Sequence, residues 1–179
     1  MRIAIFASGS GSNFQVLAER FPNNVKFIFS DRHEAYVLKR AEILNIPHVS
    51  FELKEFVSKT AYEEEIVRIL TENEIDLVVL AGYMKIITPV LLNGFSGKII
   101  NIHPSYLPAF AGSPHAIEES HAAKMGLGVT VHYVDEGVDT GEVIAQQTVE
   151  YHENIKVYEE RIHAVEHELY AQVIEELLK

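Results

Sequence analysis

The sequence predicts an α/β protein of the Rossmann-like type, in which a mostly parallel, twisted sheet carries helices on both faces. Two observations support this prediction. Short apolar, β-branched runs alternate with helical patterns along the first hundred residues, as they do in a parallel sheet covered on both sides. The run Asp76–Ala81 (DLVVLA) is almost entirely apolar, as expected of a strand buried on both faces. A length of 179 residues, 47% of them hydrophobic, suits one folded domain.

The predicted elements follow one another closely. Strands are predicted at residues 2–7, 25–30, 49–51, 76–81, 98–102, 129–134 and 142–149. Helices are predicted to begin near residue 14 and to cover residues 35–44, 60–71, 89–92, 117–125 and 155–178. Two of these helices have an apolar stripe at helical spacing, formed by Tyr62, Ile66, Ile69 and Leu70 and by Tyr158, Ile162, Val165, Leu169 and Val173. We expect a single domain over residues 1–179, with a nucleotide-binding half at about 1–100 and a catalytic half at about 101–179.

Composition excludes several classes of protein. The 15 basic and 26 acidic residues leave a net charge of −11, which argues against a nucleic-acid partner because that affinity comes largely from Lys and Arg. There is no cysteine, so disulfides and thiolate metal sites are excluded. No apolar run approaches the ~20 residues of a membrane helix, and the N-terminus does not resemble a signal peptide. The expected protein is cytoplasmic and has no membrane partner; no oligomeric state follows from the sequence.

A glycine-rich loop, Ser8–Asn13 (SGSGSN), connects the first strand to the first helix. Glycines allow a close approach of the backbone, and the amides at a helix N-terminus attract anions, so the loop predicts a phosphate site. Ser12 and Asn13 would add side-chain donors and are good N-cap residues. A P-loop would end in Gly-Lys-Ser/Thr, which is absent. A dinucleotide loop would have a third glycine where Phe14 stands, although Asp31 imitates its ribose-binding acid. A plain turn without ligand is the alternative.

Asn101 and His103 lie at the predicted carboxyl end of a strand, where open α/β sheets bind their ligands. Because they are two residues apart, their side chains share one face. An amide beside an imidazole suits oxyanion stabilisation and proton transfer. Asp139, in a glycine-flanked turn, could reach His103 and favour its protonated form. The alternative is a core histidine with an unrelated turn aspartate.

These segments resemble the 10-formyltetrahydrofolate-using formyltransferases, and the similarity runs essentially from end to end. The most specific match is the segment 101–108 (NIHPSYLP) with the downstream Asp-x-Gly at 139–141. Further matching segments are 81–87 (AGYMKII), 129–134 (VTVHYV) and 166–167. Within the family, the loop at 8–13 is similar to that of the glycinamide ribonucleotide branch.

The resemblance implies an enzyme of purine biosynthesis that transfers the formyl group of 10-formyltetrahydrofolate to the amine of 5-phosphoribosylglycinamide, with small-molecule substrates and no metal. The implied catalytic residues are Asn101, His103 and Asp139. The implied ribonucleotide contacts are Gly11, Ser12, Asn13 and Glu166. The implied folate contacts are Lys59, Met84, Lys85, Ile86, Ile87 and Asn101. Lysines 59 and 85 stand where relatives often have arginine, so they lack the planar fork of a bidentate contact.

Three alternatives remain open. Residues 163–167 (HAVEH) spell the H-x-x-E-H pattern of a zinc peptidase family. A non-catalytic phosphosugar- or dinucleotide-binding module would need only the glycine loop, and another 10-formyltetrahydrofolate-using enzyme would share the catalytic residues. Four further histidines show no convergent pattern and are expected to be ordinary surface or core residues: His115, His121, His132 and His152. The loop 106–112 is a predicted lid, with a candidate cis bond at Leu107-Pro108.

Overall fold

The computed structural model describes residues 1–179 and divides into two compact units, Met1–Ile100 (unit 1) and Asn101–Lys179 (unit 2). Seven strands have the order β3-β2-β1-β4-β5-β6-β7. The pairs β1–β2, β1–β4 and β2–β3 are parallel, and β6–β7 is antiparallel. The predicted α/β class with a mostly parallel sheet is therefore confirmed.

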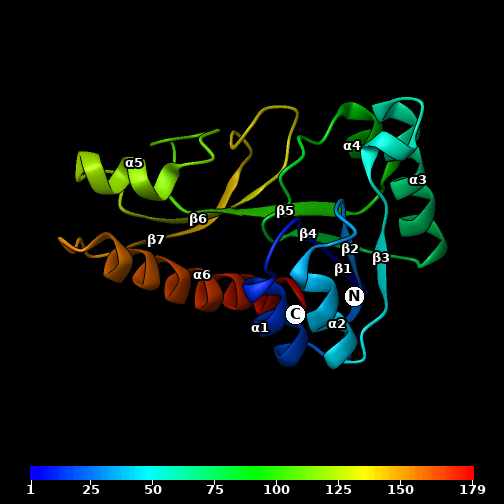
Figure 1. The fold of residues 1–179 in the computed structure, drawn as a ribbon, viewed down its shortest axis with the longest axis horizontal. Helices are drawn as coiled ribbons and strands as arrows, with labels where there is room; N and C mark the ends of the chain where they lie inside the picture. Colours follow the sequence, from blue (N-terminus) through cyan, green and yellow to red (C-terminus); the bar gives the residue numbers. More distant parts are fainter. The chain divides into compact units, whose positions relative to one another are not determined.

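Unit 1 alternates strands and helices as the sequence predicts. Its strands are β1 (Ile3–Phe6), β2 (Val25–Ser30), β3 (His48–Ser50) and β4 (Leu77–Leu80). Its helices are α1 (Ser12–Arg20), α2 (Tyr36–Ile43), α3 (Lys59–Glu72) and α4 (Pro89–Gly94), with a short 3₁₀ turn, η1 (Leu53–Glu55). Every residue of β1 and β4 is buried, because helices cover both faces of these strands. In Figure 1, α1 and α2 lie on one side of these strands and α3 and α4 on the other.

Unit 2 is built around a long C-terminal helix. Strand β5 (Lys98–His103) crosses the boundary between the units, and α5 (Ala116–Ala123), β6 (Gly128–Tyr133), β7 (Val143–Thr148) and α6 (Ile155–Leu177) follow it. The Asn154 side chain caps α6 by accepting a hydrogen bond from the Lys156 amide. Helix α6 contacts both β6 and β7, and Figure 1 shows it running beside them. No helix of the chain is long and apolar enough to span a membrane.

The structure corrects three local predictions. Helix α1 begins at Ser12 with Gly11 as its N-cap, and no side chain caps it, so Ser12 and Asn13 are not N-caps. The predicted apolar stripes are also adjusted. In α6 Val165 is only partly buried, whereas its neighbour Glu166 is buried, and in α3 Ile69 is only partly buried. Turn η1 was not predicted; it is held by a capping box between Glu52 and Glu55.

Candidate active site

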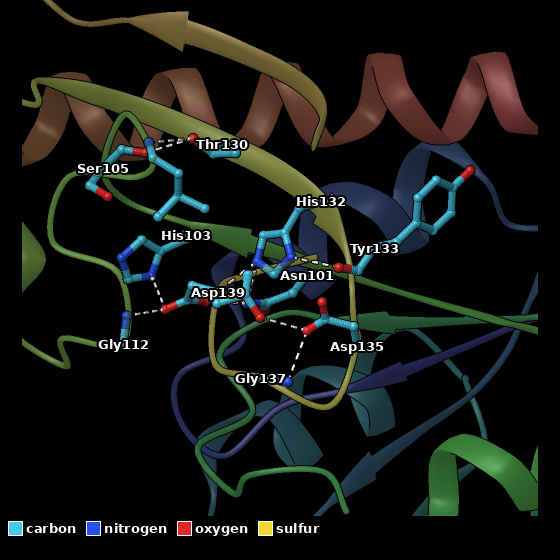
Figure 2. A network of polar contacts seen from close by, with 12 residues as sticks. Asn101, His103, Ser105, Gly112, Thr130, His132, Tyr133, Asp135, Gly137 and Asp139 are labelled. Atoms are coloured by element: carbon cyan, nitrogen blue, oxygen red, sulfur yellow. Dashed lines mark hydrogen bonds and ion pairs between the residues drawn. The ribbon is translucent and has the colours of Figure 1, made fainter. Parts of the chain in front are cut away.

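Unit 2 gathers polar side chains around one carboxylate, that of Asp139 (Figure 2). Its Oδ2 lies 3.3 Å from His103 Nδ1 and accepts a 2.7 Å hydrogen bond from the Gly112 amide. Its Oδ1 lies 3.4 Å from both His132 Nε2 and Asn101 Nδ2. We call these five residues the Asp139 cluster. The structure therefore brings together the three residues that the sequence singled out in this half: Asn101, His103 and Asp139.

Strand β5 positions two members of the cluster. Asn101 and His103 lie on one face at its carboxyl end, as the two-residue spacing predicts. Besides facing Asp139 through Nδ1, His103 approaches the Phe110 carbonyl oxygen through Nε2 at 3.0 Å. Both partners can only accept hydrogen bonds. The arrangement therefore suits an imidazolium with a proton on each nitrogen.

Asp139 itself lies in a turn with a left-handed backbone, at φ 57°. Aspartate and asparagine tolerate this region better than most other residues, because their short polar side chains can bond locally. Burial by itself raises the pKa of the Asp139 carboxyl. The hydrogen bond from His132, the charge of His103 and the Gly112 amide outweigh burial and hold that pKa below its ordinary value. Asp139 is thus an ionised carboxylate in a mostly buried position.

His132 was expected to be a core or surface histidine without convergent partners; it is a core residue, but the expected lack of partners is wrong. Its ring is buried in β6 and contacts both Asp139 and Asn101, whose Nδ2 lies 3.4 Å from Nε2. The signal in the sequence is weak: in the strand 129–134 (VTVHYV), Thr130 and His132 are polar residues two positions apart, so they share one face. Only the neighbourhood of β5 and β6 reveals that it faces Asn101.

In unit 1, the loop 8–11 between β1 and α1 is fastened on both sides. The Val37 amide donates to the Gly9 carbonyl (3.1 Å), and Arg40 Nε donates to the Ser10 carbonyl (2.7 Å). On the other side, the Ser8 amide donates to the Gly82 carbonyl at 3.0 Å. The carbonyls of Gly9 and Ser10 are thereby occupied by protein donors. The backbone amides at the start of α1 follow directly, and this end of the helix carries a partial positive charge.

Gly11 is the residue that this loop most requires. Its φ of 80° lies in the left-handed region, and a Cβ there would stand 2.3 Å from Val37 Cγ2. At Gly9, by contrast, a Cβ would meet nothing within 4 Å. Arg40, which sequence reasoning did not select, adds a positive charge beside the loop and lies 5.1 Å from the Tyr36 ring. The loop geometry therefore suits an anion.

Two lysines expected to contact folate have partners within unit 1. Lys59, the first residue of α3, donates from Nζ to the Ile86 carbonyl at 2.5 Å. Lys85 Nζ lies 3.6 Å from Oδ2 of the buried Asp31. The side chains of Met84 and Ile86 are 60% and 58% exposed, so they present apolar surface beside this backbone. Ile87, the last residue of the segment, is buried in the core.

A buried carboxylate holds Thr88 and the start of α4, directly after segment 83–87. Glu63, in α3, is 1% exposed and accepts hydrogen bonds from the Thr88 amide (3.1 Å) and the Leu91 amide (3.2 Å). The Thr88 hydroxyl donates to the same group. Within the acidic run 63–65, where Glu64 is exposed, Glu63 is the residue that is buried. Its burial is decided by α4, whose first turn lies against α3.

Glu166 faces a histidine on its own helix. Its Oε2 lies 2.8 Å from His163 Nδ1, and Glu159 Oε1 lies 3.5 Å from His163 Nε2. The hydrogen bond to Glu166 raises the pKa of His163, against the opposing effect of burial. No group of three or more metal-ligating side chains is assembled in the chain.

The segment 104–115 connects β5 to α5 and carries the cis bond that the sequence predicts at Leu107-Pro108. The Ser105 carbonyl accepts from the Thr130 hydroxyl at 2.8 Å, and the Leu107 amide donates to the same hydroxyl oxygen at 3.1 Å. Strand β6 thus anchors the first part of the segment. Its later part, Phe110 and Gly112, contacts His103 and Asp139.

Comparison with known proteins identifies the family. The formyl transferase family model matches residues 1–174, so the chain belongs to this family. It is 43% identical to the phosphoribosylglycinamide formyltransferase of Bacillus subtilis, covering 99% of this chain and 94% of that protein. The crystal structure of phosphoribosylglycinamide formyltransferase from Streptococcus pneumoniae has a TM-score of 0.93 at 52% identity, over 99% of both chains. That of glycinamide ribonucleotide transformylase 1 from Geobacillus kaustophilus has a TM-score of 0.90 at 49% identity, over 99% of this chain and 98% of that chain.

Proposed function

We propose that the chain transfers the formyl group of 10-formyltetrahydrofolate to the amine of 5-phosphoribosylglycinamide, giving formylglycinamide ribonucleotide and tetrahydrofolate in purine biosynthesis. The observation that carries the proposal is the Asp139 cluster, in which one ionised carboxylate contacts an imidazole and an amide at the end of β5. High identity over nearly the full length to relatives named for this activity supports it.

The chemistry assigned to the cluster is stabilisation of charge. The neutral amine of the ribonucleotide attacks the formyl carbon, and the formyl oxygen becomes an oxyanion. Asn101 and protonated His103 donate hydrogen bonds to that oxygen, each worth about 2.7–4 kcal/mol in comparable sites. As the bond from the formyl carbon to folate N10 breaks, the proton lost by the attacking amine ends on N10, and His103 assists that transfer. Asp139 keeps His103 charged and oriented.

Binding is assigned to separate groups. Gly11, Ser12 and Asn13 would hold the 5′-phosphate at the start of α1, and Glu166 would contact the ribose hydroxyls of the ribonucleotide. The exposed apolar side chains of Met84 and Ile86, with the neighbouring backbone, would contact the folate ring system. The lysines at 59 and 85 would act chiefly by fixing this segment, since both already bind protein groups.

The segment 106–112 would act as a lid. His103 Nε2, one of the proposed oxyanion donors, faces the Phe110 carbonyl, so this contact must open before the ring can donate to substrate. With small-molecule substrates, no nucleic-acid partner and no membrane partner, the proposed location is the cytoplasm.

A formyl-transfer assay tests the proposal directly. Purified protein is given 10-formyltetrahydrofolate with glycinamide ribonucleotide or, in a parallel reaction, with initiator methionyl-tRNA. We expect turnover with the ribonucleotide alone. Turnover with the tRNA alone would assign the chain to another branch of the family, and binding without turnover would favour the non-catalytic phosphosugar module.

A further inference from the structure

His132 is the one side chain of the Asp139 cluster to which the proposed mechanism gives no role. Its ring is 2% exposed and lies on β6 (Figure 2). A buried imidazole within 3.4 Å of both a carboxylate and an amide is not needed to fill space, because an apolar side chain would do so without desolvating a polar group. Its contacts therefore call for an explanation.

The hydrogen bonds of His132 determine which of its nitrogens can titrate. Nδ1 lies 2.8 Å from the Tyr133 carbonyl oxygen, which can only accept, so Nδ1 carries a proton. Nε2 is then the titrating nitrogen. When neutral, Nε2 accepts a hydrogen bond from Asn101 Nδ2; when protonated, it donates to Asp139 Oδ1 instead. The two charge states give Asn101 and Asp139 different partners.

We infer that His132 is a positioning residue whose charge decides how Asp139 is shared between two histidines and which partner holds the Asn101 amide. The inference rests on the proposed function for its effect on turnover. It rests on geometry alone for the coupling among His132, Asp139 and Asn101.

The polar and charged groups that face His132 come from two segments besides its own strand. From β5 come neutral Asn101 and, across the carboxylate, His103; from the turn after β6 come Asp139 and the more distant Asp135. Val143, its partner on β7, is apolar. Burial by itself lowers the pKa of His132, but the bonds to Asp139 and Tyr133 and the acidic charges outweigh burial and raise it. A charged His132 therefore competes with His103 for one carboxylate.

Two substitutions separate the charge of His132 from its hydrogen bonds. In His132→Gln the amide occupies the region of Nε2, so a neutral donor to Asp139 remains. In His132→Asn the amide occupies the region of Nδ1, so the bond to Tyr133 remains and the group facing Asp139 is lost. Neither variant can titrate.

The expected result is a displaced pH profile. Without the competing charge, the Asp139 carboxylate is paired with His103 alone, so the alkaline limb of kcat moves upward by about one pH unit in both variants. At its plateau, kcat falls about tenfold in His132→Asn and much less in His132→Gln, which retains a donor. The KM values of both substrates stay near those of the wild type. Loss of kcat at every pH without displacement of the limb would overturn the inference, since a purely structural role predicts it.

An NMR titration tests the coupling without activity. Imidazole ¹⁵N signals should show a proton on Nδ1 of His132 throughout, and the Nε2 proton should be lost at lower pH in Asp139→Asn than in the wild type. The same titration curve in both proteins would overturn the inference. If the wild type failed to transfer formyl groups, the proposed function would fall, and this titration would still decide the coupling.

Discussion

The Ser8–Asn13 loop of unit 1 and the Asp139 cluster of unit 2 differ in how far apart their parts lie in the sequence. The loop is six consecutive residues, and its anion-binding capacity resides in the backbone and in the start of α1. The cluster joins residues from 101 to 139 and acts through side chains. A local site depends on the conformation of a short segment, whereas a dispersed site depends on the pairing of strands and on charge. Substitutions in the cluster should therefore lower kcat, whereas substitutions in the loop should lower stability and ribonucleotide binding.

The largest effect is expected from removing the charge of the cluster. Asp139→Asn preserves shape and tolerates the left-handed backbone at this position, but it leaves His103 without a counter-charge. We expect kcat to fall about 10³-fold, within the range of general acid–base contributions, with the KM of the ribonucleotide little changed. Steady-state kinetics measure both. The control is Glu136→Gln, which removes an exposed charge from the same turn. Near-normal turnover of Asp139→Asn would reject the assigned chemistry.

The opposite pattern is expected from the loop. In Gly11→Ala, the new Cβ would clash with Val37 at a φ that alanine rarely adopts. We expect the free energy of unfolding to fall by about 1–3 kcal/mol. The KM of the ribonucleotide should rise by on the order of tenfold through loss of a phosphate hydrogen bond.

Gly9→Ala, two residues away in the same loop, is the matched control, because its Cβ has open space. Denaturant unfolding and steady-state kinetics on the two variants separate the residues. Equal effects at both positions would mean that backbone conformation at Gly11 does not determine binding.

A smaller effect is expected from Glu63, a side chain of α3 that contacts Thr88 and Leu91 in unit 1. Glu63→Gln replaces one carboxylate oxygen by an NH₂ group that faces the donors of Thr88 and Leu91. We expect the free energy of unfolding to fall by about 1–3 kcal/mol. The KM of folate should rise while that of the ribonucleotide stays constant, because the disturbed segment is 83–88. Glu64→Gln, exposed on the same helix, is the control. An unchanged folate KM would confine Glu63 to a structural role.

The smallest effect is expected at His163, in α6. Its pKa is raised in the folded protein, so its contribution to stability is present below the pKa of the unfolded chain and is lost as pH rises through the folded pKa. The stability difference between wild type and His163→Gln should therefore shrink from about pH 5.5 to about pH 8.5. The side chain is 45% exposed, so the change should stay below about 1 kcal/mol. Urea unfolding at both pH values measures it, and a difference that grew with pH would contradict the assigned pairing.

Local patterns predicted most of the fold. Every strand and α-helix was found near its observed bounds, because buried strands and amphipathic helices have distinct periods. The N-cap of α1 was misplaced because the left-handed conformation of Gly11, which lies against Val37, ends the loop one residue earlier. The burial of Glu166 does not follow from its residue type; the pairing with His163 makes burial of this carboxylate tolerable.

By itself, the sequence determined the α/β class, the glycine loop and the three residues Asn101, His103 and Asp139, because each depends on residues close in the chain or on a specific motif. The tertiary structure alone decided that His132 shares Asp139, that Arg40 flanks the loop and that Glu63 holds the 83–88 segment. Each of these contacts joins a side chain of ordinary type to a group that lies elsewhere in the sequence. Their chemistry arises only when strand and helix packing removes water and leaves them as one another's partners.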